Sequence, residues 1–169
     1  MFFMGYPYLD GAKYASSAVT NGVAKLRYGT GAAVELSITN SAMVLRFKSV
    51  PEGVENYKLE LHMSAGFGAR KVKWAINDES GAFPRDISSP ESGKTLYKGK
   101  ANDFAVFNPD GTAFAMRFPD ENALMELRDV REWQRIILTY VAPIPTNAPD
   151  TALHIPFGAD PAFKDFAPQ

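Results

Sequence analysis

One segment in the middle of the chain alternates strictly between apolar and polar side chains. From Tyr57 to Ser64 the sequence reads Tyr-Lys-Leu-Glu-Leu-His-Met-Ser. Successive side chains of a β-strand point to opposite faces, so a period of two predicts a strand with one buried and one exposed face. A second alternating segment lies between Lys71 and Asn77. Strands of this kind are typical of antiparallel sheets that have one face in water.

Similar short segments recur along the 169 residues, and they are separated by residues that favour tight turns. We predict an all-β protein, an antiparallel, jelly-roll-like β-sandwich that forms a single domain over 1–169. Residues 1–22 are expected to be an irregular N-terminal segment, and 158–169 an irregular tail. One segment, 123–132, could form a helical turn instead, because it is rich in Ala, Leu, Met and Glu. The expected strands are 23–28, 33–38, 43–50, 57–64, 71–77, 94–98, 103–107, 112–118, 123–128, 134–142 and 152–157.

Composition limits the classes of partner. The formal net charge of −1 argues against a dedicated nucleic-acid binder. The absence of cysteine excludes disulfides, thiol catalysis and cysteine-ligated metal. No apolar stretch approaches the roughly 20 residues of a membrane-spanning helix, so no membrane partner is expected. The first residues do not resemble a signal peptide. We expect a secreted, extracellular module of a larger multidomain protein, whose leader lies outside these 169 residues.

Basic side chains occupy the expected polar faces of three successive strands. If these strands were neighbours in one sheet, their side chains would form a cationic platform that attracts acidic polysaccharides, and Arg can bind a carboxylate through two hydrogen bonds. The alternatives are an ordinary solvated face, or strands in opposite sheets, which would scatter the platform. The side chains are Arg46 and Lys48, then Lys58 and His62 with Glu60 between them, then Lys71 and Lys73.

Aromatic rings are the second feature that bears on sugar recognition, because a ring can stack on the flat C–H face of a pyranose. Trp133 lies in a charged segment beside Arg131 and is the better candidate for an exposed ring, although it could also close one end of the sandwich. Tyr97 and Phe83 are weaker candidates, the latter within a long polar loop expected at 78–93. Trp74 is predicted to be in the core. Three further tyrosines could stack on a ligand or anchor the N-terminal segment: Tyr6, Tyr8 and Tyr14.

No cofactor is required by any motif. A structural calcium ion could be held by carboxylates, which are the hard oxygen ligands that calcium prefers. The candidate pairs are Asp78 with Glu79, and Asp103 with Asp110.

Catalytic arrangements can also be drawn from the sequence, but an inert sandwich would contain the same residues. A lyase would use His62 or Tyr140 as the base, with Arg46 or Lys73 neutralising the carboxylate of the substrate. A glycoside hydrolase would need two carboxylates beside a groove, for example Glu60 and Glu35.

Three segments of the second half suggest a family. They read Phe-Ala-Met-Arg-Phe-Pro from Phe114, Leu-Met-Glu-Leu-Arg-Asp-Val-Arg-Glu-Trp from Leu124, and Ile-Ile-Leu-Thr-Tyr from Ile136. This run resembles the later strands of β-sandwich modules attached to bacterial carbohydrate-active enzymes. The resemblance implies a non-catalytic carbohydrate-binding or accessory module, and it assigns no binding residue.

The sequence therefore predicts a module that binds a polysaccharide, with acidic ones among the candidates, by ring stacking and hydrogen bonds from Arg, Lys and Glu. The alternatives are a small polysaccharide lyase or glycoside hydrolase, and a structural or protein-interaction domain. No catalytic residue is assigned. The predicted ligand-binding residues are Trp133, Arg131, Tyr97, Lys58, Glu60, His62, Lys71 and Lys73.

Overall fold

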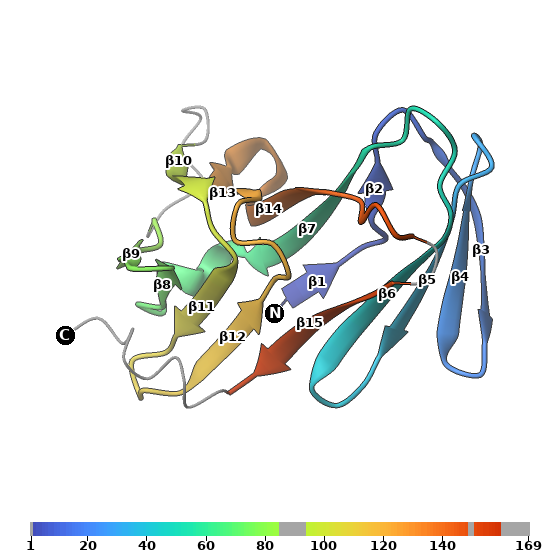
Figure 1. Cartoon of the computed structure of the whole chain (residues 1–169). Coiled ribbons are helices and arrows are strands. Elements are labelled where there is room, and N and C mark those ends of the chain that lie inside the picture. Colours follow the sequence, from blue (N-terminus) through green and yellow to red (C-terminus); the bar gives the residue numbers. More distant parts are fainter. Residues whose placement is uncertain (1, 85–93, 149–150, 160–169) are drawn as a thin grey trace.

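Two antiparallel β-sheets make up most of the structure, a computed structural model that describes residues 2–84, 94–148 and 151–159 (Figure 1). The six-stranded sheet has the order β1-β7-β14-β13-β10, and β2 also pairs with β7. Its strands are β1 (Phe2–Met4), β2 (Tyr8–Leu9), β7 (Asn56–Ser64), β10 (Thr95–Lys100), β13 (Leu124–Val130) and β14 (Arg135–Pro143).

The nine-stranded sheet has the order β3-β4-β5-β6-β15-β12-β11-β8-β9. Every strand pair in both sheets is antiparallel. The predicted all-β sandwich is thereby confirmed, while jelly-roll connectivity stays a prediction. The strands are β3 (Tyr14–Thr20), β4 (Val23–Tyr28), β5 (Ala33–Ile38), β6 (Ala42–Ser49), β8 (Lys73–Ile76), β9 (Glu79–Ala82), β11 (Asp103–Phe107), β12 (Ala113–Arg117) and β15 (Ala152–Gly158).

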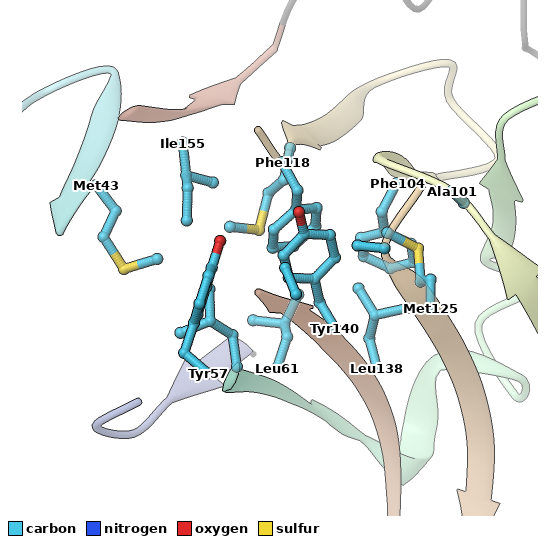
Figure 2. Packing of buried hydrophobic residues seen from close by; sticks show 14 of the residues in the cluster. Met43, Tyr57, Leu61, Ala101, Phe104, Phe118, Met125, Leu138, Tyr140 and Ile155 are labelled. Atoms are coloured by element: carbon cyan, nitrogen blue, oxygen red, sulfur yellow. The ribbon is translucent and has the colours of Figure 1, made fainter. Parts of the chain in front are cut away.

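The core lies between the two sheets and is built from their alternating apolar side chains. Figure 2 shows Tyr57, Leu61 and Tyr140 of the six-stranded sheet facing Met43 and Ile155 of the other. The alternation of the central segment has the predicted effect, because every second residue of β7 is buried and the residues between them are half-buried on the outer face. A chain of this length can bury such a core without disulfides.

Most strand predictions agree with the structure. Strands β4, β5 and β11 have the predicted bounds, and the others differ at their ends by one or two residues. The alternative of a helical turn at 123–132 is wrong for most of that segment, because Leu124–Val130 forms strand β13. A single 3-10 turn, η2 (Arg131–Trp133), then leads into β14. The other short helix is η1 (Ala65–Phe67).

The N-terminal segment corrects the prediction of an irregular region at 1–22. Strands β1 and β2 pair with β7, and β3 pairs with β4 at the edge of the other sheet. Asn21 and Gly22 connect β3 to β4 with φ values of 51° and 76°. Such positive φ values are those of a two-residue hairpin turn, for which Asn-Gly is the preferred sequence. The signal was therefore present in the sequence.

The N-terminal segment also crosses from one sheet to the other. Leu9 is buried in the core, and the buried Tyr28 hydroxyl donates a hydrogen bond to the carbonyl of Pro7. These contacts hold residues 7–9 between β4 of the nine-stranded sheet and β7 of the six-stranded sheet. They also determine where the tyrosines of this segment lie.

The predicted loop at 78–93 is ordered at its start. Glu79–Ala82 forms β9, and Phe83 is buried with its ring 5.5 Å from that of Phe67. The remainder of the predicted loop, 85–93, lies outside the described residues, as does most of the predicted tail. Among the residues that the structure describes, no helix is long and apolar enough to cross a membrane.

Candidate functional site

Three tyrosines gather where the N-terminal segment crosses between the sheets. Tyr6, Tyr8 and Tyr14, the tyrosine cluster, are 38%, 40% and 39% exposed. The rings of Tyr6 and Tyr14 are stacked with their centroids 4.3 Å apart, and the Tyr6 and Tyr8 centroids are 5.3 Å apart. The cluster lines a hollow of about 350 Å³ together with Ala12, Lys13 and Tyr28. It is an aromatic surface that solvent reaches.

Pairing and packing explain the position of each ring. Tyr8 pairs with Lys58 on β7, whereas its neighbour Leu9 is buried, so the period of two turns Tyr8 outward. Tyr14 begins β3 and meets the edge of the Tyr28 ring, with the centroids 6.3 Å apart. Tyr28 is buried, and burial raises the pKa of its hydroxyl, which remains protonated and can donate its hydrogen bond to Pro7.

A row of polar side chains on the outer face of β7 begins beside the cluster. This polar row consists of Lys58, Glu60 and His62. Lys58 Nζ lies 2.7 Å from Glu60 Oε1, and His62 Nε2 lies 3.2 Å from Glu60 Oε2. Lys58 Nζ also lies 4.4 Å from the centroid of the Tyr8 ring, within the range of a cation–π interaction. The tyrosine cluster and the polar row therefore form one continuous surface.

The charges of this surface influence one another. Burial would raise the pKa of Glu60, but its hydrogen bonds with Lys58 and His62 outweigh that effect and lower the pKa. Burial, followed by the nearby Glu60 carboxylate, raises the pKa of Tyr8. At neutral pH the surface thus presents an ionised carboxylate between two donors, beside a protonated phenol. It can donate and accept hydrogen bonds at closely spaced positions.

The cationic platform of three neighbouring strands is not formed. Arg46 lies on β6 and Lys73 on β8, both in the nine-stranded sheet and separated by three strands. Lys58 and His62 lie on β7 in the opposite sheet. The chain changes sheets before and after β7, so the alternative in which the basic strands lie in opposite sheets is the one that the structure has. Lys71 lies in the turn before β8.

The aromatic residues that were predicted as candidates for ligand binding differ in their exposure to solvent. Trp133 is 63% exposed in η2, in agreement with its expected accessibility. The prediction that Tyr97 binds ligand is corrected, because this residue is only 8% exposed. Its ring packs edge-to-face with that of Trp74, with the centroids 6.4 Å apart. Phe83 is likewise buried, so neither ring is available for a ligand. The side chain of Arg131 lies outside the described part of the structure.

The catalytic arrangements are not assembled. Tyr140 is 1% exposed and cannot reach a polysaccharide as a base. Arg46, Lys73 and Glu35 all belong to the nine-stranded sheet, whereas His62 and Glu60 lie on the outer face of the other. The residues that each scheme requires are therefore on different sheets.

Candidate metal ligands are also separated or engaged. Asp103 binds Arg117 through two hydrogen bonds of 2.7 and 2.9 Å, and Asp110, at the other end of β11, accepts hydrogen bonds from Thr112. Asp78 and Asp103 line a hollow of about 400 Å³ together with Glu121. Within the described ranges, no group of three or more His, Asp or Glu side chains is arranged to hold a metal ion.

Comparison of the chain with protein-family models, curated proteins and solved structures finds no match.

Proposed function

We propose that this protein is a non-catalytic polysaccharide-binding module whose binding site is the tyrosine cluster with the adjoining polar row. The observation that carries the proposal is the gathering of three half-exposed tyrosine rings around one hollow. Sites for sugars combine apolar ring contact, which gives affinity, with a few polar groups, which give specificity. Both components lie next to each other on this surface.

The polar row supplies the second component. Lys58 and His62 can donate to sugar oxygens, and Glu60 can accept from sugar hydroxyls. Lys13 adds a further cation to the lining of the hollow. These cations make uronate-containing and sulfated polymers the acidic ligands to compare with neutral glucans. Binding that involves them should weaken as salt is added, because salt screens exposed charges.

The proposal extends to the setting of the module. A sandwich that only binds glycan acts by holding another activity near its substrate, so we place it in a secreted, multidomain protein, as the resemblance to accessory modules implies. In the described residues, no group of three or more His, Asp or Glu side chains is arranged to hold a metal ion, so a structural calcium ion would need other ligands. Both statements are tested with the whole natural polypeptide, by its location and by the metal content of the purified protein.

Replacing Tyr6 by alanine should weaken glycan binding strongly without unfolding the protein. Stacking of a ring on a flat partner contributes on the order of 1–3 kcal/mol by alanine substitution in nucleic-acid systems, and a similar contribution predicts at least a fivefold loss of affinity. Tyr6 lies outside any strand and is 38% exposed, so folding should be preserved. Affinity electrophoresis in gels that contain each polysaccharide measures the loss.

The matched control is Tyr6→Phe, which keeps the ring and should keep most of the affinity. Equal retention of wild type, Tyr6→Ala and Tyr6→Phe on a polysaccharide that binds would show that the site lies elsewhere. Lack of retention by wild type across neutral, uronate and sulfated glycans would dismiss the proposed function itself.

Trp133→Ala should weaken binding of long chains more than binding of short oligosaccharides. Tyr8 is opposite Lys58, and Arg135, close to Trp133, is opposite Ser64. Lys58 and Ser64 are six residues apart along β7, a distance of about 20 Å. A polysaccharide could span both ends, whereas a disaccharide could not. Calorimetry with a series of oligosaccharides would test this, and the same fractional loss at every chain length would contradict it.

A lyase is the second candidate because Glu60 lies 3.2 Å from His62 and could orient the imidazole as a base. His62 would take a proton from the carbon next to the uronate carboxylate, a carbon–carbon double bond would form as the bond from the adjacent carbon to the glycosidic oxygen breaks, and the departing oxygen would take a proton from water. The same binding mixtures would then absorb in the ultraviolet as unsaturated ends accumulate. Binding without such absorbance favours the module.

A further inference from the structure

Strand β3 is an edge strand that is exposed along its whole length. All seven residues from Tyr14 to Thr20 are exposed, and the strand pairs only with β4. Its sequence, Tyr-Ala-Ser-Ser-Ala-Val-Thr, contains no charged residue and no proline. An edge of this kind presents unpaired backbone groups on which another strand can pair.

The other edge strands of the two sheets are protected in the ways that natural proteins use. Strands β2, β1 and β9 have two, three and four residues, so all three offer few backbone groups. Strand β10 has six residues but carries Lys98 and Lys100, and charged side chains oppose edge pairing. Of the described edges, β3 is therefore the one that is both long and uncharged. Its register shifts between Tyr14 and Ser16, so the segment from Ser16 to Thr20 is the part that offers regular pairing.

The hairpin turn determines which backbone groups of β3 point outward. Thr20 and Val23 flank a two-residue turn and form a hydrogen-bonded pair, so the backbone groups of Thr20 and Ala18 point toward β4. Those of Ser17 and Val19, at alternating positions, point away from the sheet. They are available to a further antiparallel strand.

The apolar face at this edge is also incomplete. Val19 lies in a cross-strand row with Ala24, Leu36 and Leu45, and Leu45 is fully buried in the core. At the edge, however, Val19 is 74% exposed, and Ile38 on the same face of β5 is 67% exposed. Apolar surface that continues from the core into solvent is typical of an interaction site.

We propose that β3 pairs with β3 of a second copy of this chain, antiparallel and about a two-fold axis at Ala18, the middle of the regular segment from Ser16 to Thr20. Two-fold pairing brings the same surface of both copies together and places Val19 of each copy opposite Ser17 of the other, so that their outward backbone groups can pair. The paired segment contains no charged residue, so like charges do not face each other. Lys25 on β4 would be three strand spacings, about 14 Å, from Lys25 of the other copy, beyond the Debye length of about 8 Å at physiological ionic strength.

Sedimentation of the full chain at increasing concentration tests the pairing. We expect the average mass to rise from 18.6 kDa toward twice that value, with a dissociation constant on the order of 10–100 µM, because the interface is small. Ser17→Pro removes an outward N–H at a position where an edge strand tolerates proline, and should weaken association at least tenfold.

The matched control is Ser17→Ala, which loses the same hydroxyl but keeps the N–H and should associate like wild type. Val19→Lys provides a second block that leaves the backbone unchanged. Circular dichroism confirms that each variant is folded. Wild type that stays monomeric up to about 500 µM, or folded Ser17→Pro and Val19→Lys variants that associate like wild type, would overturn the proposal.

Discussion

Tyr140→Ala is expected to lower the free energy of unfolding by about 3–5 kcal/mol, the usual cost of removing a large buried aromatic ring. Tyr140 is 1% exposed, and its ring is stacked on that of Phe118 with the centroids 4.4 Å apart. Its hydroxyl donates to the carbonyl of Asp120 at 3.2 Å and accepts from the Asp120 N–H at 3.0 Å. One side chain thus joins β14 to the loop after β12. Urea unfolding followed by circular dichroism measures the change.

Tyr140→Phe separates the ring from the hydroxyl. It keeps the stacking but leaves the Asp120 N–H and carbonyl without these partners, so we expect a smaller loss of about 1–3 kcal/mol. Tyr6→Ala, which removes an exposed ring, should have little effect on stability. If Tyr140→Ala and wild type unfolded at the same urea concentration, the contacts around Tyr140 would not stabilise the sandwich.

Gly81→Ala is expected to destabilise the protein by about 1–3 kcal/mol, as overpacking against a buried side chain does. A Cβ atom at Gly81 would lie 2.7 Å from Cζ2 and 2.9 Å from Cε2 of Trp74. The Trp74 ring cannot move freely, because it is 6% exposed and contacts the Tyr97 ring. Tyr97 is held in turn, since its hydroxyl donates a hydrogen bond to the carbonyl of Lys100 at 3.3 Å and lies close over Gly99, where an added Cβ would be 2.8 Å away.

Gly66→Ala is the matched control, because its added methyl group would meet Ser64 Oγ at an ordinary 3.6 Å. Measurement in a Trp133→Phe background leaves Trp74 as the single tryptophan, so its fluorescence reports the packing at this site directly. We expect a lower melting temperature and an altered emission for Gly81→Ala alone. Equal stability of the two alanine variants would show that the sheets adjust around Trp74 without cost.

The candidate site could be predicted only in part. Local periodicity placed Lys58, Glu60 and His62 on one face of a strand, and the structure confirms that they are adjacent. The three N-terminal tyrosines were also candidates from the sequence, but no local pattern places them beside β7. That neighbourhood arises from the pairing of Tyr8 with Lys58, two residues that are fifty positions apart.

Tyr97 shows why burial was misjudged at one position. A tyrosine between Leu96 and Lys98 is compatible with either face of a strand. The structure buries it because β10 lies at the edge of the six-stranded sheet, where the β8–β9 hairpin of the other sheet supplies Trp74. Contacts between sheets have no local signal in the sequence.

Alternation, turn residues and composition were sufficient to determine that this chain forms antiparallel strands and where most of them begin and end. These features act between neighbours in the chain, where side-chain direction and backbone φ preferences are local properties. The assignment of each strand to a sheet was decided only in the tertiary structure, because it depends on burying all the apolar faces at once. That assignment separated the basic strands, brought the tyrosines to the polar row and left β3 as an open edge.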